Sequence, residues 1–349
     1  MADKENLPPI HSVADIWQYQ PDHRAIRSAT PEEIAAGLTA DAYFVGTQQI
    51  LDHMGLADTE VTAEIFSNHS GVLAGVDEAV SLLRGQGVSV EALEEGSNVS
   101  AKTVVVRIRG PYRAFGIYET AMLGALASAS GWATAARTAV AAAGGVPVIS
   151  FGARHVHPAV ASVLDRAALV GGCVGASSIL GARQAGLLPS GTMPHALLLM
   201  VGDTVTAAEA YDQVMPASAP RVVLVDTFHD ETEEALRVAR AMGDRLQSVR
   251  LDTPKERGGV TPDLVRELRQ RLDQAGFERL GIFVSGGITP ERMEALREAG
   301  VTGFGVGSYI AGAPPLDMTM DLKEVDGKPI AKRGRIPGIT PQANLVRKF

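Results

Sequence analysis

The second half of the chain alternates short apolar runs with longer segments whose apolar residues recur every three to four positions. The apolar runs are rich in β-branched residues and predict strands: VPVIS, RVVLV, SVRL, GIFV and TGFGV. Helices are predicted between them. In the clearest one, Thr261 is the N-cap, Pro262 opens the first turn and Gly276 ends the helix. Strand–helix alternation predicts parallel βα units, in a barrel or a doubly wound sheet.

The first half is less regular. We expect an extended arm over residues 1–30, a strand at TVVVRIRG (103–110) and a long helix of small residues that ends at Gly144-Gly145. Near the other end, Asp326-Gly327 between two strand-like arms predicts a hairpin outside the βα repeat. We therefore predict an N-terminal domain over 1–145, a βα domain over 146–315, and a C-terminal hairpin and tail, 316–349, that returns to the first domain.

Composition excludes several classes of protein. The 349 residues carry a net charge of −8 without a long basic run, which argues against nucleic-acid binding. We find neither an apolar stretch long enough to span a membrane nor a secretory signal, so we expect a cytoplasmic protein without a membrane partner. The single cysteine, Cys173, cannot form an intrachain disulfide, and a buried structural residue is expected.

Polar residues gather where the predicted strands end. Asp226, Asp252 and Ser285 each directly follow an apolar run, and two further clusters are Arg154-His155 with His157, and Gly307-Ser308. In a βα barrel these ends meet at one mouth, where active sites form. We therefore predict a site there.

Each cluster favours a chemistry. The glycine loops after the last two strands expose backbone N–H groups and favour a phosphate group, although tight turns alone would also require glycine. Asp226 and Asp252 suit sugar hydroxyls or water-bound Mg²⁺, or they cap helices. Arg154 suits a carboxylate or phosphate, and RHVH lacks the further ligands of a zinc site. His195, between a Gly-Thr-x-Pro turn and an apolar run, is a core histidine, a metal ligand or a chemical group; the sequence leaves these open.

Six segments together resemble the type II phosphoribosyltransferases, and most of all the nicotinate phosphoribosyltransferases. They are ISFGARHVHP, GTMPHA, RLDT, VSGGI, GVGSYI and DLKEVDGKPIAKRGR, between about Phe66 and Arg335. The resemblance implies an α/β fold with an irregular parallel βα barrel plus an α/β sandwich domain built from both chain ends. It also implies a homodimer or higher homo-oligomer.

The reaction that this resemblance implies joins nicotinate to phosphoribosyl pyrophosphate, with Mg²⁺, to give nicotinate mononucleotide and pyrophosphate in NAD biosynthesis. His195 matches the family histidine that ATP phosphorylates, although Pro194 replaces the commoner alanine before it. The implied catalytic residues are His195, Arg154, Asp252 and Asp226. The implied substrate-binding residues are Tyr43, Glu119, Arg137, His155, His157, Thr192, Ser285, Gly286, Gly287, Gly305, Gly307 and Ser308.

Three alternatives remain. Quinolinate phosphoribosyltransferases share the segment that begins at Glu119, but two of their cations are absent, because Thr120 and His155 stand in those places. Losing two cations weakens the binding of a dianion more than that of a monoanion, which favours nicotinate. A catalytically idle barrel that senses a phosphorylated metabolite is a non-enzyme alternative. A sugar-phosphate isomerase or epimerase barrel would explain the phosphate loops but not the additional domain.

Overall fold

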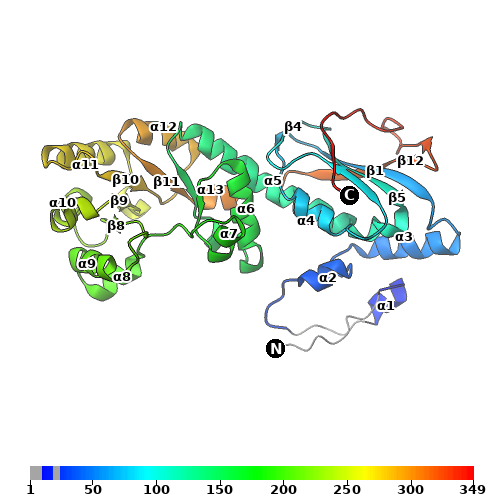
Figure 1. Ribbon diagram of the computed structural model, residues 1–349, viewed down its shortest axis with the longest axis horizontal. Helices are drawn as coiled ribbons and strands as arrows, with labels where there is room; N and C mark the ends of the chain where they lie inside the picture. The colour runs from blue at the N-terminus through cyan, green and yellow to red at the C-terminus, as the bar shows by residue number, and fades with distance from the viewer. Residues whose placement is uncertain (1–9, 19–23) are drawn as a thin grey trace. The chain divides into compact units, whose positions relative to one another are not determined.

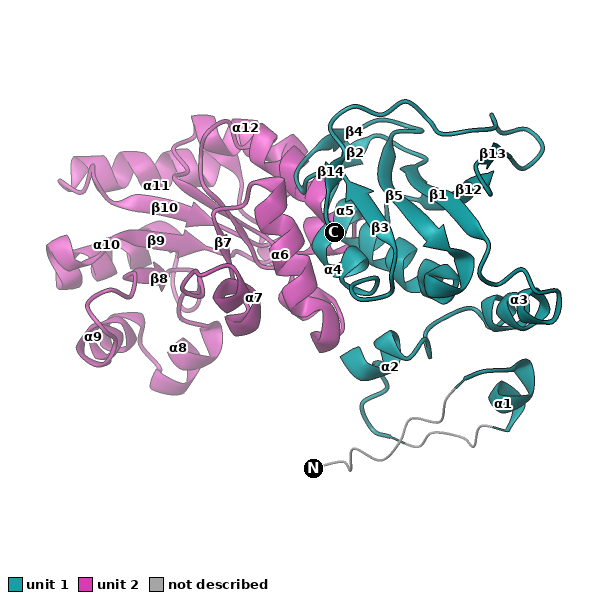
Figure 2. Ribbon diagram, turned by 45° about the vertical axis from the view of Figure 1, so that its right-hand side comes forward, with its two compact units in different colours: residues 1–131, 314–349 teal, residues 132–313 magenta. Residues whose placement is uncertain are grey.

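The computed structural model describes residues 10–18 and 24–349, which form two compact units. Unit 1 contains residues 1–131 and 314–349, and unit 2 contains residues 132–313 (Figure 2). The units divide within helix α5 (Glu119–Ala142), before the boundary at residue 145 that the glycine pair suggested. Met122 and Leu126 of this helix pack in the core of unit 1, whereas Ala136 and Ala139 pack in the core of unit 2.

Unit 1 is built around an antiparallel sheet that joins both ends of the chain (Figure 1). Its strands lie in the order β13 (Lys328–Pro329), β12 (Met318–Val325), β1 (Glu60–Ser67), β5 (Val104–Pro111), β3 (Ser89–Ala92) and β14 (Val346–Arg347). A second, two-stranded sheet pairs β2 (Gly71–Val72) with β4 (Asn98–Val99). Because β1 pairs with β12 on one side and β5 on the other, the sandwich domain contains both chain ends, as the resemblance implied.

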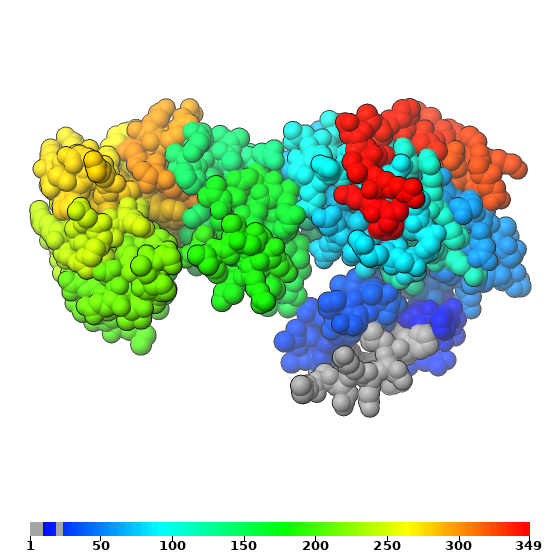
Figure 3. Space-filling model, in the orientation of Figure 1, coloured from blue at the N-terminus to red at the C-terminus, as the bar shows by residue number. Residues whose placement is uncertain are grey.

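The C-terminal segment of unit 1 turns back at Asp326 and Gly327. Both residues have a positive φ, 48° and 70°, which matches the right-handed twist of a two-residue hairpin turn. The chain then crosses the sheet, where Thr340 accepts a hydrogen bond from Arg107 of β5, and ends at β14 beside β3. Figure 3 shows this last segment in red, lying over the cyan residues of the same unit.

Helices α2 (Pro31–Ala35), α3 (Ala42–His53), α4 (Val76–Ser81) and the first half of α5 complete unit 1, with short 3-10 turns at Tyr112–Ala114 and Gly116–Tyr118. The expectation of an extended arm over residues 1–30 is wrong in part. Helix α1 (Val13–Trp17) begins there, because the Ser12 hydroxyl and the Asp15 carboxylate cap each other's backbone N–H groups. The rest of that prediction falls partly on residues 1–9 and 19–23, which lie outside the described residues.

Unit 2 contains a curled parallel sheet that opens on one side. Its order is β7 (Gly175–Ala176), β6 (Val148–Ser150), β11 (Gly303–Val306), β10 (Gly281–Val284), β9 (Ser248–Leu251) and β8 (Val222–Leu224). Between β7 and β8 the chain forms helices α7 (Ile179–Gln184), α8 (His195–Val201) and α9 (Thr204–Val214). The described strands therefore form part of a barrel, with β7 and β8 as its edges.

The remaining helices of unit 2 are α6 (Ala161–Gly171), α10 (Glu231–Met242), α11 (Pro262–Gln274), α12 (Pro290–Glu298) and α13 (Ser308–Ala311). On α11, Val265, Leu268 and Leu272 are fully buried, as their spacing predicts. They pack with Val249 and Ile282 of the sheet in one core. This packing holds the strands in place, and it therefore also positions the residues that directly follow the strands. No helix in the described part of the chain is long and apolar enough to cross a membrane.

Candidate functional site

A row of hydrogen-bonded polar side chains crosses the ends of three neighbouring strands in unit 2. Asp226, Asp252 and Ser285 follow β8, β9 and β10, which are adjacent in the sheet. The backbone N–H of Asp252 donates to Asp226 Oδ2 at 3.0 Å, and the Ser285 hydroxyl donates to Asp252 Oδ1 at 2.9 Å. Parallel strands in register place these residues at one edge, so their meeting follows from the topology.

His195 joins this row from the first turn of α8. Its Nε2 lies 3.1 Å from Asp226 Oδ1. An ionised carboxylate only accepts hydrogen bonds, so in the neutral form of the imidazole Nε2 carries the proton and Nδ1 keeps its lone pair. The Asp226 side chain is fully buried, whereas the His195 side chain is 40% exposed, more than a core histidine would be. Burial raises the pKa of Asp226, and the neighbouring His195 partly offsets this effect.

Arg250 of β9 holds several of these groups together. Its guanidinium donates to Ser285 Oγ at 2.9 Å, to Thr192 Oγ1 at 2.8 Å and to Asp252 Oδ2 at 3.1 Å. The same group lies 5.1 Å from the ring centre of Phe151. Burial lowers the pKa of Arg250, and Asp252 partly opposes that effect. Thr192, a predicted substrate-binding residue, is thus tied to the row.

Arg154 and His155 lie after β6, in a single 3-10 turn (Ala153–His155). Arg154 is close enough to affect the pKa of Arg250 by charge repulsion. Its guanidinium is exposed, and no residue in the described ranges forms a hydrogen bond or ion pair with it. The Nε2 of His155 lies 3.1 Å from the position that a Cβ on Gly307 would take. Cationic and donor groups therefore border the row without being engaged by it.

The glycines of the two predicted phosphate loops differ in the structural reason for which glycine stands there. Gly286 and Gly287 have a positive φ, 83° and 63°, and a Cβ on Gly286 would lie 2.8 Å from Asp252 Oδ1. Gly307 approaches the Phe151 carbonyl just before Ser308. Gly305, in contrast, lies within β11, where the rings of Phe151 and Phe283 fill the space of its side chain. Its lack of a side chain is therefore explained by packing.

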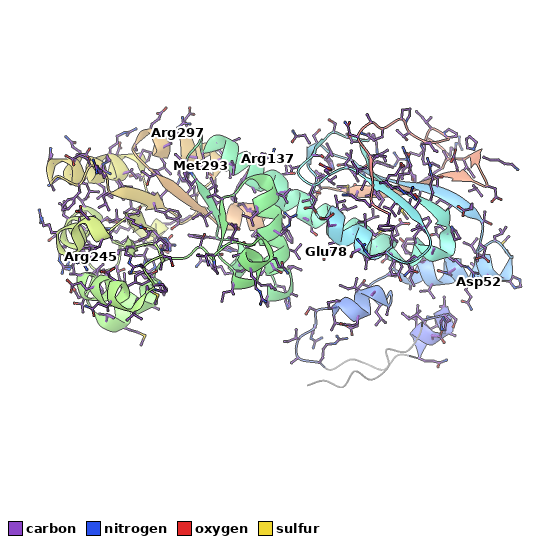
Figure 4. The ribbon with its side chains drawn as sticks, in the orientation of Figure 1. Asp52, Glu78, Arg137, Arg245, Met293 and Arg297 are labelled. Carbon is purple, nitrogen blue, oxygen red and sulfur yellow. The ribbon has the colours of Figure 1, made fainter. Side chains whose placement is uncertain are left out.

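Four other predicted residues do not join the row. Arg137, labelled on α5 in Figure 4, donates to the carbonyls of Gly171 at 2.8 Å and Val170 at 3.3 Å, and so caps the end of α6. His157 is exposed, and its Nδ1 accepts from the backbone N–H of Ala159. Tyr43 and Glu119 belong to unit 1.

Tyr43 and Glu119 have surroundings of their own in unit 1. The hydroxyl of Tyr43 donates to Asp41, which also accepts from Thr120, at 3.3 and 3.1 Å. Tyr43 is 63% exposed. Glu119 lines a cavity of about 380 Å³ whose other walls are mainly apolar. Burial, with the charges of Asp321 and Asp41, raises the pKa of Glu119 to about 7.

The carboxylates of Asp226 and Asp252 are compatible with Mg²⁺ that is held through water or through a phosphorylated substrate. All four oxygens of Asp226 and Asp252 already accept hydrogen bonds. Within the described ranges, no three His, Cys, Asp or Glu side chains gather as metal ligands. Because each carboxylate oxygen has a second lone pair, water-mediated contact to a hydrated Mg²⁺ stays compatible with this arrangement.

Arg250 and Phe151 belong to the site but were not predicted from the sequence. The signal for Arg250 was present, because a charged residue interrupts the apolar run SVRL two positions before Asp252, on the same face of the strand. Phe151 directly follows β6, next to the residues that we did select. Cys173 is buried as expected, and burial raises the pKa of its thiol to about 12.

Two family models match the chain in sequence order. Residues 41–130 match the N-terminal domain of quinolinate phosphoribosyl transferase, and residues 132–321 match its C-terminal domain. A nicotinate phosphoribosyltransferase of Mycobacterium tuberculosis is 34% identical over 68% of this chain and 52% of its own. This chain thus spans about half the length of the curated relatives that it matches first. A probable nicotinate-nucleotide pyrophosphorylase [carboxylating] of Methanothermobacter thermautotrophicus is 24% identical, over 82% of this chain and 96% of its own.

The solved structures that resemble this chain include enzymes with the same kinds of name. A nicotinate-nucleotide pyrophosphorylase of Pyrococcus furiosus is 45% identical, with a TM-score of 0.87 over 90% of this chain and 82% of its own. Human nicotinic acid phosphoribosyltransferase has a TM-score of 0.69 over 86% of this chain and 77% of its own, at 19% identity, which is a likeness of fold alone.

Proposed function

The chain belongs to the type II phosphoribosyltransferase family, that of quinolinate phosphoribosyltransferase, and from this membership we propose that it transfers a 5-phosphoribosyl group to nicotinate. The donor is phosphoribosyl pyrophosphate with Mg²⁺, and the products are nicotinate mononucleotide and pyrophosphate. The observation that carries the proposal is the hydrogen-bonded row from His195 through Asp226 and Asp252 to Ser285, with an unengaged Arg154 beside it.

Each part of the site has a task in this reaction. As the bond between ribose C1 and pyrophosphate breaks, C1 gains positive charge and the leaving oxygen gains negative charge. Arg154 and His155 stabilise that negative charge, in a site whose dipoles are already oriented. Asp252 and Asp226 accept hydrogen bonds from ribose hydroxyls or from water on Mg²⁺, and the loops of Ser285–Gly287 and Gly307–Ser308 bind the 5-phosphate. The nitrogen of nicotinate then attacks C1, which needs positioning more than a strong base.

Quinolinate phosphoribosyltransferase is the second candidate. The matched family models and the longer match to a carboxylating pyrophosphorylase favour it. Nicotinate is favoured by the charges present. Thr120, where that enzyme has an arginine, exchanges hydrogen bonds with Asp41, and His155 stands in place of a lysine. A monoanion needs fewer of these cations than a dianion.

We assign to His195 the coupling of ATP hydrolysis to this transfer. Hydrogen bonding of Nε2 to a buried carboxylate leaves Nδ1 as the nucleophile. Nδ1 attacks the γ-phosphorus of ATP, ADP leaves, and a phosphohistidine forms, which water later hydrolyses to phosphate. The Asp226 carboxylate stabilises the ring while it carries the phosphoryl group.

We further propose that the active form is a homo-oligomer. Large apolar side chains are exposed on α7 and α8, with Ile179 at 77%, Leu199 at 62% and Met200 at 89%. These two helices are consecutive along the chain, and large exposed apolar groups favour burial against another chain. In such an assembly the exposed ring of Tyr43 is available to stack on the pyridine, and Glu119 contributes to the same substrate contacts, as the family resemblance implies.

The test is product formation from nicotinate, phosphoribosyl pyrophosphate and Mg²⁺, with and without ATP, beside a parallel reaction with quinolinate. We expect nicotinate mononucleotide, in larger yield with ATP. Product from quinolinate alone would support the second candidate. Tight binding of phosphoribosyl pyrophosphate without turnover of either pyridine would instead favour a sensor of phosphorylated metabolites.

A further inference from the structure

The loop after β9 carries Lys255, a cation to which the site described above gives no role. The loop contains a 3-10 turn, Lys255–Arg257, which follows Pro254. The ammonium of Lys255 is exposed, and no residue in the described part of the chain forms a hydrogen bond or ion pair with it. The neighbouring cations Arg257 and Arg292 are both engaged, and their contacts hold the loop.

Both ends of this loop are fixed. At one end, the Thr253 hydroxyl donates to Glu231 Oε1 at 3.0 Å, and Arg257 Nε lies 3.4 Å from the same oxygen. Glu231 is only 2% exposed, so it provides a rigid attachment. At the other end, Arg292 of α12 donates to the carbonyl of Val260 at 2.5 Å and to that of Gly287 at 2.8 Å. Arg292 thereby joins this loop to the glycine loop after β10.

Lys255 borders open space beside the backbone of Gly287. A Cβ on Gly287 would meet the Cε of Lys255 at 3.8 Å and no other atom within 4 Å. The glycine backbone is therefore accessible on that side, and the nearest side chain is a lysine whose charge is not engaged. The loop of Gly286 and Gly287 leads into α12, whose N-terminus favours negative charge.

We propose that Lys255 binds the 5-phosphate of the phosphoribosyl substrate, as the charged wall opposite the glycine backbone. This inference rests on the proposed function. It divides the two anions of the substrate between two places: the 5-phosphate lies between Lys255 and Gly286-Gly287, and pyrophosphate lies beside Arg154 at the end of β6. A phosphate group is close to a dianion at neutral pH, and a lysine supplies the point charge that backbone N–H groups lack.

The test compares Lys255→Gln and Lys255→Arg with Arg279→Gln in the full-length protein. Arg279 is exposed just before β10, at the opposite end of the strand from the glycine loop, so its replacement is a matched loss of one positive charge. For Lys255→Gln we expect roughly a ten-fold or greater rise in the KM for phosphoribosyl pyrophosphate. A change of this size is typical when one hydrogen bond to a charged group is lost. The KM for nicotinate should stay within two-fold. Lys255→Arg should recover most of the loss.

Binding of ribose 5-phosphate, measured by titration calorimetry, separates this inference from the proposed function. It requires no turnover, and we expect Lys255→Gln to weaken it about as much as it raises the KM, while Arg279→Gln leaves it unchanged. Unchanged binding and an unchanged KM in Lys255→Gln would overturn the inference even in an active enzyme. If the wild type converts neither pyridine but Lys255→Gln still weakens ribose 5-phosphate binding, the proposed function fails and the phosphate contact stands.

Discussion

The ends of β8, β9 and β10 differ from the end of β6 in how far their polar groups are already paired. After β8–β10, Asp226, Asp252 and Ser285 bond to one another, and Arg250 links them to Thr192. After β6, Arg154 has no partner among the described residues, and His155 is exposed. The first group is arranged before any ligand arrives, whereas the second has donors to offer to an anion. Replacing residues of the first group should cost both stability and activity, and replacing Arg154 should cost activity alone.

The largest effect is expected at Arg154. Arg154→Ala removes the cation that we propose to face the leaving pyrophosphate, so kcat/KM should fall by about 10²–10³-fold, as in other losses of transition-state stabilisation. The free energy of unfolding should change by less than about 0.5 kcal/mol, because Arg154 holds nothing in place. Steady-state kinetics and urea unfolding measure the two quantities. A variant that is both inactive and clearly destabilised would contradict the distinction between the two strand ends.

Arg250→Met should lower both kcat/KM and the free energy of unfolding. The change removes one donor from each of Asp252, Ser285 and Thr192, and buried groups that lose a partner cost about 1–3 kcal/mol. We expect a loss of stability of that order, together with a fall in kcat/KM of at least about ten-fold, since Asp252 is then held by Ser285 alone. Full stability in this variant would show that the row is not organised by Arg250.

His195→Ala should abolish the stimulation of the reaction by ATP. ATP should no longer stimulate product formation, and a slower basal reaction should remain, because in our proposal the histidine acts in coupling rather than in the transfer. Phosphate release from ATP and nicotinate mononucleotide formation are measured together, with His53→Ala, on an exposed part of α3, as a matched control. ATP stimulation equal to that of the wild type would exclude the phosphohistidine.

The smallest effect concerns a carboxyl group of unit 1. Glu119 has a folded-state pKa of about 7, above the ordinary value of 4.5, because folding disfavours its charged form. Wild-type stability should therefore fall as the pH rises from about 4.5 to 7, and Glu119→Gln should abolish that loss. Because the side chain is partly exposed, we expect a gain on the order of 1 kcal/mol at pH 8. The two proteins should be nearly equal at pH 5 in thermal unfolding, and a gain independent of pH would disprove the assignment.

The sequence predicted those features that depend on local pattern. The strands β5, β6 and β8 to β11 and the helices α5, α11 and α12 follow from apolar spacing, capping residues and terminal glycines, whereas strands such as β1 and β3 were not predicted. The placement of Asp226, Asp252 and Ser285 at one edge follows from parallel strands, which end at the same side. For the same reason, the sequence alone was enough to place the candidate site at that edge before any contact was known.

Features that depend on which side chains meet could not be predicted in that way. Arg137 looked like a ligand-binding cation, but the end of α6 lies beside it and takes its donors. Gly305 looked like part of a phosphate loop, but the register of β11 turns it toward Phe151. Arg250 gave a signal only as a charge within a strand, and two of its three partners, Thr192 and Ser285, come from distant parts of the chain.

The parallel sheet of unit 2 ends on both sides in strands of only two or three residues. In unit 2 the edges are β7, with two residues, and β8, with three. An open barrel, unlike a closed one, has free edges whose backbone groups can pair with another molecule. Edges this short offer few consecutive backbone hydrogen bonds, so the open sheet is a poor template for strand addition and for the aggregation that begins with it.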